Sequence, residues 1–353
     1  MKVLHLPVNV ASIPSNTIKG LRKIGIDARG LVAQQAYCQS SNGLVVISNK
    51  PVKGVNKILE EIVFSYFFLK MLRWADIVHW YFGSSIMPWW LDIRLVKLLN
   101  KPALIEWLGS DIRIPEVELK DNPYYRTIFH SPEFPSKQLI KSWRKQKFFA
   151  NHGFEVLVPP CMLQYLKKDT WNTIHVLRQR IMVSDYIPSY PEPDKKCPVI
   201  VHTPTKPVLK GTHSVLNAIE RLKKNHCFEF RLIQNLSHAD TLQAIRHSDI
   251  FLDQFVIGAH GMAALEAMAF GKPVVCYIKP SLVSIYPPDL PIINANQDNL
   301  VQILEKLITD GEKRNEIGKK SRNYVEKYHD AVNLAVELKR IYSTVIANKN
   351  GRY

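Results

Sequence analysis

The sequence predicts an α/β protein built from two Rossmann-like domains that face each other across a cleft. The chain has 353 residues, enough for two domains of about 150 residues each. Short β-branched runs alternate with helical segments, as they do in the βαβ units of a parallel sheet. Between residues 187 and 196 three prolines and several charges interrupt this alternation, which indicates a stiff polar linker.

In the N-terminal half, the pattern predicts a helix near the start and a series of short strands. The helix is expected at Asn16–Ile24, because Gly25 follows it as a C-terminal cap. Residues 111–135 are rich in proline and aromatic side chains and have no clean period, so an irregular excursion is expected there. The expected strands are Val3–Leu6, Ala28–Val32, Leu44–Ser48, Ile77–Tyr81, Ala103–Trp107 and Glu155–Val158.

After the linker the alternation of strands and helices starts again. Apolar residues between 300 and 308 recur with helical spacing and predict one more helix near the end. The predicted domains are residues 1–187 and 199–330, joined by a linker at 188–198 and followed by a C-terminal helix and basic tail at 331–353. The other expected strands are Val199–His202, Phe228–Ile233, Ile250–Asp253 and Val274–Ile278, and the helices are His213–Lys224, Ala239–His247 and Met262–Phe270.

Composition narrows the classes of protein to consider. Apolar residues make up 46% and charged residues 22%, as in an ordinary globular protein, and no run reaches the roughly 18 apolar residues of a spanning helix. The net charge of +16 favours an anionic partner: a nucleic acid, an anionic membrane face or a phosphorylated substrate. Scattered cysteines without a CxxC pair indicate reduced thiols in a cytoplasmic protein. They are Cys38, Cys161, Cys197, Cys227 and Cys276.

The segment Asp253–Val275 carries the clearest signs of a binding site. A strand ends, a loop with Gly258 and Gly261 turns, and a helix begins near Met262. The first backbone N–H groups of such a helix have no partner within it, so they can hold phosphate oxygens. Glu266 lies one turn further on, where its carboxylate can accept hydrogen bonds from a sugar diol. The alternative is that both glycines are turn residues and that Glu266 only complements the helix dipole.

A second candidate is the loop Lys206–Thr212, between a strand and a helix. Lys210 lies at the carboxyl end of the strand beside a helix N-terminus, so its charge and the helix dipole can act on one diphosphate. Thr212 is a plausible N-cap of the helix. The alternative is an ordinary solvated loop lysine.

These segments together resemble the donor domain of retaining glycosyltransferases of family four, which have the GT-B fold. The likeness covers roughly residues 1–330 and implies a nucleotide-sugar donor, in general no bound metal, and no cofactor. In the first half it rests on Val3-Leu4-His5-Leu6-Pro7, Asp76-Ile77-Val78-His79 and Gly109-Ser110-Asp111-Ile112-Arg113. In the second half it rests on Lys210-Gly211 and Gly261-x3-Leu265-Glu266-Ala267-Met268-Ala269-x-Gly271-x-Pro273-Val274-Val275.

Residue by residue, the resemblance assigns Lys210 to the donor diphosphate and Glu266 to the nucleotide ribose. Lys206 stands in for the family's upstream arginine. The sequence departs from the family at Gly258, which replaces the first glutamate of an E-x7-E pattern, and at Leu108, where a histidine often precedes Gly-Ser-Asp. The donor-binding residues expected on this basis are Lys206, Lys210, Gly258, His260, Gly261, Met262, Ala263 and Glu266.

Asp111 and His79 are the candidate catalytic side chains, as the best remaining polar groups of the first domain. The alternatives are that Asp111 caps a loop or helix and that His79 is a buried strand histidine. Without an acid at position 258, Lys210 and the helix amides would supply the positioning and the charge stabilisation. No D-x-D pair is present to hold a cation beside a diphosphate, so no metal site is expected.

Two segments of the first domain favour an anionic membrane surface as a partner. Residues 141–149 interleave cations with aromatic side chains, and residues 58–74 form a strongly apolar helix candidate flanked by cations. The alternatives are a solvated helix with its aromatic side chains turned inward and a helix packed on the sheet. No nucleic-acid recognition module is visible, so no nucleic acid is expected as a partner.

The sequence therefore predicts a retaining, metal-independent glycosyltransferase of the cytoplasm, acting at the inner face of the membrane. Its partners would be a nucleotide-sugar donor and a saccharide acceptor, from the envelope or linked to a lipid. One alternative is a catalytically degenerate member that only binds a nucleotide or saccharide, motivated by Gly258 and Leu108. The other is a nucleotide-sugar epimerase with the same architecture.

Overall fold

The computed structural model describes residues 1–34, 39–40, 43–48, 55–132, 134 and 142–351, and Cys38 and Lys141 lie outside these ranges. The chain divides into two compact units. The first comprises Met1–Ile114, Lys137–Met182 and Asp330–Tyr353, and the second comprises Pro115–Ser136 and Val183–His329. Each unit contains its own parallel β-sheet, so the predicted α/β class with two Rossmann-like domains is confirmed.

The first unit is built on a seven-stranded sheet in the order β3-β2-β1-β4-β5-β6-β7, in which every pair is parallel. The central strands are buried, as their β-branched and aromatic runs require. The edge strand β7 was not predicted. It has only three residues, too few for an alternation of apolar and polar side chains to be recognised in the sequence. The strands are β1 (Lys2–Leu6), β2 (Asp27–Gln34), β3 (Leu44–Ser48), β4 (Ile77–Tyr81), β5 (Ala103–Glu106), β6 (Glu155–Val158) and β7 (Ile174–Val176).

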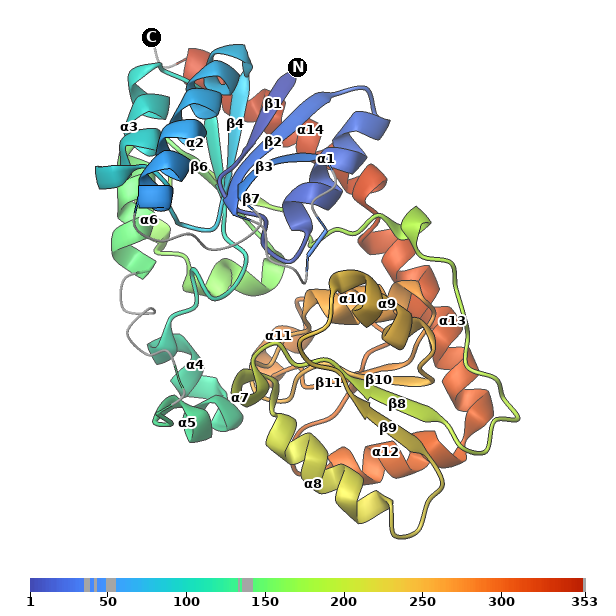
Figure 1. Ribbon diagram of the computed structural model, residues 1–353. Helices are drawn as coiled ribbons and strands as arrows, with labels where there is room; N and C mark the ends of the chain where they lie inside the picture. The colour runs from blue at the N-terminus through green and yellow to red at the C-terminus, as the bar shows by residue number, and fades with distance from the viewer. Residues whose placement is uncertain (35–38, 41–42, 49–54, 133, 135–141, 352–353) are drawn as a thin grey trace. The chain divides into compact units, whose positions relative to one another are not determined.

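Helices cover both faces of this sheet (Figure 1). α1 (Ile13–Lys23) and α14 (Ala331–Asn350) pack closely on one face, since a Cβ on Gly20 would lie 2.3 Å from the carbonyl oxygen of Ala331. The C-terminal helix expected at 331–353 is thus part of the first unit. The other face carries α2 (Val55–Trp74), α3 (Leu91–Leu98) and α6 (Ser142–Asn151), and short 3₁₀ helices lie at η1 (Pro88–Trp90), η3 (Pro160–Tyr165) and η4 (Lys168–Thr170).

The second unit is built on a five-stranded parallel sheet in the order β12-β11-β10-β8-β9. Its core joins the sheet to α8 and α12 through Val215, Leu252 and Leu304. The strands are β8 (Val199–His202), β9 (Glu229–Leu232), β10 (Ile250–Leu252), β11 (Val274–Cys276) and β12 (Ile293–Asn294). The helices are α7 (Pro207–Lys210), α8 (Thr212–Leu222), α9 (His238–Arg246), α10 (Met262–Ala269), α11 (Pro280–Val283), α12 (Leu300–Thr309) and α13 (Gly311–Tyr328), with the 3₁₀ helix η5 (Val183–Asp185).

The expectation of an irregular excursion at 111–135 is wrong, because two short helices lie within it. They are α4 (Pro115–Asp121) and α5 (Pro123–Phe129), and they belong to the second unit. The side chain of Asn122 caps α5 by accepting the N–H of Tyr125 at 3.1 Å, and its Nδ2 donates to the carbonyl of Val256 at 2.8 Å. Each helix spans only seven residues, too short for a periodic pattern to reveal.

The cysteine state differs from the expectation of reduced thiols. Cys197 and Cys227 form a disulfide with their Cα atoms 5.0 Å apart, whereas Cys161 and Cys276 are buried and lie outside this disulfide. The two paired cysteines come shortly before β8 and β9, which are neighbours in the sheet. Thirty residues separate them in sequence, so only the strand pairing brings them together.

Candidate functional site

Lys210 lies beside the loop that leads into helix α10, as the predicted diphosphate site requires. Its Nζ is 2.5 Å from Oδ1 of Asp253, and 3.1 Å from the point where a Cβ on Gly261 would lie. Gly211 follows with φ +73°, and a Cβ there would be 3.1 Å from the Cβ of Phe255. The Lys210-Gly211 pair therefore fits tightly against both ends of the loop after β10.

Asp253 is the residue that connects these segments, and the sequence had not singled it out. Besides pairing with Lys210, it accepts the N–H of Gly261 at 2.6 Å, so one fully buried carboxylate holds the lysine and the start of α10. Burial alone would raise the pKa of Asp253, but the charge and hydrogen bond of Lys210 lower it below its usual value. The available sequence signal was an acid directly after a buried strand, at the head of a glycine-containing loop.

The first turn of α10 is suited to an anion. Gly261 is the N-cap, has extended backbone and provides no side-chain cap. Met262 and Ala263, the first residues of α10, are half-buried, and they directly follow Gly261, which lies beside the Lys210 ammonium group. Phosphate oxygens can accept hydrogen bonds from the backbone amides of a helix start and from an ammonium group.

Glu266 lies one turn into α10 and is held by two other segments. Its Oε1 is 2.8 Å from Nε2 of His238 at the start of α9 and 3.3 Å from the hydroxyl of Tyr186. Burial alone would lower the pKa of His238, but the hydrogen bond and charge of Glu266 raise it. An ionised carboxylate has about four acceptor positions, so Glu266 can still bind a diol. No sequence signal pointed to His238, because only the fold brings it to Glu266.

The structure shows how the chain fills the space at position 258. Gly258 has φ +76°, and a Cβ there would lie 2.8 Å from the Cβ of Lys279. The Lys279 N–H donates to the Gly258 carbonyl at 3.0 Å. The Lys279 ammonium group is buried against Asp121 at 3.0 Å and Glu118 at 3.4 Å. Position 258 is where the family's motif has a glutamate. In this chain the aliphatic part of Lys279, whose ammonium group is held by two acids of α4, fills the space beside Gly258.

His260 borders the cluster around Asp253, since its charge helps to lower the pKa of that carboxyl, whereas Lys206 is not among the residues that contact Asp253. His260 is buried, and its ring lies 5.2 Å from that of Tyr286 and 5.9 Å from that of His329, so it packs among aromatic side chains. Lys206 is the exposed N-cap residue of α7. Of the predicted donor-site residues, the structure gathers Lys210 and Gly261 around one carboxylate, with Met262, Ala263 and Glu266 on the helix that follows.

In the first unit, Asp111 organises its own loop. Its Oδ1 accepts the N–H groups of Gly109 at 2.7 Å and Leu108 at 3.2 Å. Burial raises the pKa of Asp111 to about 6, although these backbone hydrogen bonds oppose the rise. The geometry matches the alternative in which Asp111 caps a loop, and a pKa near neutrality also suits a group that exchanges protons.

Asp111→Asn is expected to remove a pH dependence of stability. The pKa of Asp111 is about 6 in the folded protein and about 3.9 in an unfolded chain, so folding disfavours its charged form. The wild type therefore loses stability through this group as the pH rises from about 4 to 6, by about 3 kcal/mol in all. We expect urea unfolding at several pH values to show that the free energy of unfolding of the variant rises relative to that of the wild type as the pH increases through this window. If the difference in free energy of unfolding between the two proteins did not change with pH, the burial of the charged carboxylate would be contradicted.

His79 does not present a polar group to solvent, which corrects its candidacy as a catalytic side chain. It is fully buried on β4, with Nδ1 2.6 Å from the Tyr342 hydroxyl and Nε2 3.1 Å from Glu106. Its ring stacks on Tyr81 with centroids 4.2 Å apart. Burial lowers the pKa of His79, against the opposing influence of Glu106. The physical reason is its strand position, since β4 is buried on both faces.

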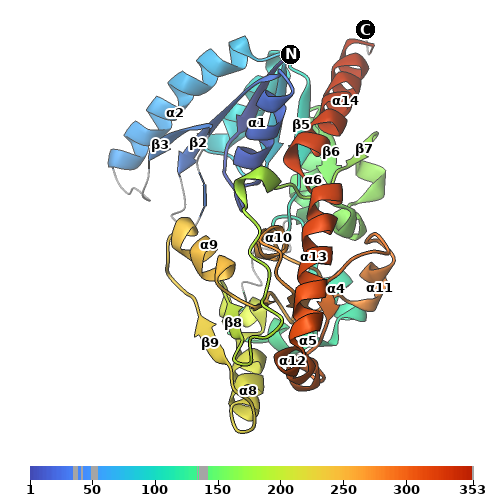
Figure 2. The same cartoon turned by 90° about the vertical axis from the view of Figure 1, so that its right-hand side faces the viewer.

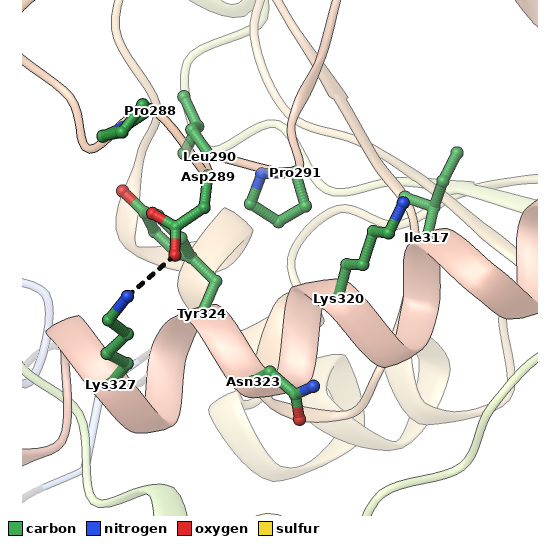
Figure 3. Close-up of a pocket in the computed structure, with 9 residues that line it drawn as sticks. All are labelled: Pro288, Asp289, Leu290, Pro291, Ile317, Lys320, Asn323, Tyr324 and Lys327. Carbon is green, nitrogen blue, oxygen red and sulfur yellow. Dashed lines mark hydrogen bonds and ion pairs between the residues drawn. The ribbon is translucent and has the colours of Figure 1, made fainter.

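A pocket of about 560 Å³ opens in another part of the second unit, where the loop 288–291 meets five side chains of α13 (Figure 3). Lys327 and Asp289 form an ion pair at its edge, with 3.1 Å between Nζ and Oδ2. None of the predicted donor-site residues lines this pocket. It is therefore separate from the cluster around Asp253.

Comparisons with known proteins found a matching family model and solved structures of similar fold. The family model described as "Glycosyl transferases group 1" matches residues 216–324, from within α8 to within α13. No curated protein matches the chain significantly. Among solved structures, sucrose-phosphate synthase from Thermosynechococcus elongatus superposes with a TM-score of 0.67 at 12% identity, covering 99% of this chain and 100% of that one.

Two further structures of similar fold contain nucleotides. The catalytic domain of starch synthase IV from Arabidopsis thaliana, bound to ADP and acarbose, has a TM-score of 0.66 at 12% identity, with 98% of this chain and 99% of that chain covered. The Anabaena protein HepE, in complex with UDP and glucose, has a TM-score of 0.61 at 14% identity, with 97% and 99% covered. At these identities the likeness establishes the fold of the chain.

Proposed function

Because residues 216–324 match the family model of the glycosyl transferases group 1, we propose that the chain transfers a sugar from a nucleotide-sugar donor to a hydroxyl acceptor with retention at the anomeric carbon. The observation that carries the proposal is the meeting of Lys210, Asp253 and Gly261 at the start of α10. A diphosphate placed there accepts hydrogen bonds from the ammonium group and from the helix amides. Glu266, one turn away, receives the ribose diol.

The structural relatives support this assignment of the donor. Starch synthase IV binds ADP, and HepE binds UDP and glucose, on the same overall fold. In this chain the cationic charge for the diphosphate comes from Lys210, which Asp253 holds in place. Fixed donors of this kind stabilise the charge that builds up on the leaving diphosphate as the sugar departs. Within the described ranges, no three His, Cys, Asp or Glu side chains gather as metal ligands, and the transfer that we propose uses no divalent cation.

The acceptor that we propose is an envelope or lipid-linked saccharide, used at the cytoplasmic face of a membrane. Its support is the net charge of +16, which draws the chain toward anionic surfaces. If simple sugars accept the transferred sugar as fast as a lipid-linked saccharide does, this choice of acceptor is excluded.

A second candidate function is a catalytically inactive nucleotide-binding partner protein. The observation that favours it is the Lys279 stem beside Gly258, which leaves no room for an acid on that loop without a shift of Lys279. It predicts nucleotide-sugar binding without transfer or epimerisation, whatever acceptor is supplied.

Thermal shift against UDP-, GDP- and ADP-sugars tests the proposed donor site. We expect at least one class to stabilise the wild type. Glu266→Gln should weaken its binding about 10- to 100-fold, because hydrogen bonds from the ribose to a charged acceptor contribute about 1.5–3 kcal/mol. Glu220→Gln makes the same chemical change on an exposed part of α8 and should bind like the wild type. If none of the nucleotide sugars binds, the proposal fails.

Incubation of the best-binding donor with acceptors then distinguishes the candidate functions. Transfer with an unchanged anomeric configuration by NMR, undiminished by EDTA, is the expected result. Inversion of that configuration would contradict retention, and loss of transfer in EDTA would contradict independence from metals. Conversion of the donor sugar without any acceptor would identify an epimerase instead.

A further inference from the structure

Helix α2 is apolar on two opposite faces, and only one of them is packed. Phe64, Phe68 and Leu72 recur every four residues and are fully buried against the sheet. Ile62 and Tyr66 lie on the other side and are 60% and 63% exposed. A helix that is apolar all round is normally buried on all sides. The outward residues of α2 are Ile58, Leu59, Ile62, Val63, Tyr66 and Leu69, each more than 40% exposed.

The apolar surface continues from α2 onto the elements beside it. α2, α3 and α6 cover the same face of the sheet, opposite α14 (Figures 1 and 2). Trp89 on η1 is 83% exposed, Leu98 at the end of α3 is 77% exposed, and Trp143 on α6 is 49% exposed. η1 and α6 contact each other directly, since the rings of Trp90 and Phe148 have centroids 5.0 Å apart. We call the exposed side of α2, η1, α3 and α6 the outer face.

The charge of the outer face is almost entirely positive. Of the acids on these four elements, Asp92 is fully buried and Glu60 is buried, so Glu61 is the remaining acid, and its side chain is 25% exposed. Cations are spread over the three helices, all exposed except Lys145, which is half-buried. They are Lys57, Lys70, Arg73, Arg94, Lys97, Arg144, Lys145 and Lys147.

We propose that the outer face docks the protein onto an anionic lipid bilayer. Large apolar and aromatic side chains would enter the boundary between headgroups and acyl chains, while lysine and arginine stems extend toward the phosphates. Tryptophan and tyrosine are the residues that favour this boundary. Among the described residues no helix is both long and apolar enough to cross a membrane, so the contact would be peripheral.

A lipid surface fits the outer face better than a protein partner does. The exposed apolar side chains extend over four elements, and lysine and arginine side chains with long stems surround them. A fluid layer of anionic headgroups can neutralise cations at many positions at once, whereas a protein would need a matching acid for each. This inference concerns the first unit alone and does not depend on the donor site in the second unit.

Vesicle cosedimentation with the full chain tests the proposal. We expect binding to vesicles of phosphatidylcholine with 30% phosphatidylglycerol, and weaker binding to phosphatidylcholine alone or in high salt. Arg144→Glu with Lys147→Glu should weaken binding at least about 25-fold, because each cation near the surface contributes about fivefold. Ile62→Gln with Tyr66→Gln should weaken it at least about tenfold through lost apolar burial.

The matched controls lie on α14, which covers the other face of the sheet. Lys339→Glu with Arg340→Glu changes the net charge equally and should leave vesicle binding within about threefold of the wild type. Val336→Gln is the apolar control. Nucleotide-sugar binding should stay unchanged in all of these variants, which separates this test from that of the donor site.

Three outcomes would overturn the proposal. The first is that the wild type does not sediment with anionic vesicles. The second is that the α14 charge variant loses as much binding as the α6 variant, which would mean that net charge alone acts. The third is that the wild type forms a dimer in the absence of lipid and the Ile62/Tyr66 variant does not, which would assign the outer face to a second copy of the chain.

Discussion

Lys210→Ala is expected to abolish nucleotide-sugar binding and also to destabilise the second unit by about 3–5 kcal/mol. The binding loss follows from removing the ammonium group that lies beside the start of α10. The stability loss follows because the carboxylate of Asp253 is fully buried and would lose the ammonium group 2.5 Å away. An unpaired buried charge costs far more than the pair itself contributes. The single variant therefore cannot by itself show that Lys210 binds the donor.

Combining Lys210→Ala with Asp253→Asn separates the two effects. The amide keeps an oxygen that can accept the N–H of Gly261, and no charge is left buried. We expect the double variant to recover most of the lost stability in urea unfolding, while calorimetric titration with the nucleotide sugar still finds no binding. Recovery of binding along with stability would mean that Lys210 acts only as the partner of Asp253.

The pair Lys195 and Asp249 provides a matched control for this prediction. It is also a lysine 2.6 Å from a buried aspartate in the second unit, and neither residue belongs to the predicted donor site. Lys195→Ala should lower the free energy of unfolding without changing the affinity for the donor. Equal losses of affinity in Lys195→Ala and Lys210→Ala would show that binding merely follows stability.

The parts of the fold that were predicted well have a local cause. Buried parallel strands such as Ile77–Tyr81 and Glu155–Val158 are short β-branched or aromatic runs, and the structure has them with the predicted bounds. Helix α10 was found from its flanking residues, Gly261 before it and Gly271 after it. These signals lie within a few residues of the element that they define.

The missed features depend on contacts between distant segments. His238 reaches Glu266, and Asn122 reaches Val256 across 134 residues, only after the second unit has folded. Asp253 stood at the head of the predicted binding segment, but its role follows from Lys210 arriving beside it. A motif identifies residues that recur at fixed spacing, and it does not contain the side chains that hold those residues in place.

Helix α2 shows a different limit of the sequence. Its apolar side chains allowed both a helix packed on the sheet and one at a membrane surface, because composition does not say how many faces are covered. The structure shows that Phe64 and Phe68 are packed while Ile62 and Tyr66 are exposed. Only the position of the sheet relative to the helix distinguishes the two sets.

Arg180→Met is expected to destabilise the first unit by about 3–5 kcal/mol without changing donor affinity. Arg180 and Glu106 form a fully buried bidentate pair, with Nη1 2.9 Å from Oε1 and Nη2 2.6 Å from Oε2. Burial alone would raise the pKa of Glu106, but the charge of Arg180 lowers it to about 2. Removing the guanidinium group leaves a charged carboxylate in the core, and the predicted donor-binding residues all lie in the second unit.

The pH dependence and a second substitution test this cause. In the wild type, the low pKa of Glu106 contributes stability above pH 4.3, the approximate value for an unfolded glutamate, which is lost as the pH falls toward 2. In Arg180→Met the pH dependence reverses, because a buried carboxyl group without a partner is more stable when it is protonated. The free energy of unfolding of the variant should therefore rise relative to that of the wild type as the pH falls. Adding Glu106→Gln should restore most of the stability at pH 7 in urea unfolding. A double variant as unstable as Arg180→Met would show that the loss comes instead from the space left by the guanidinium group and its 2.6 Å hydrogen bond to Thr17.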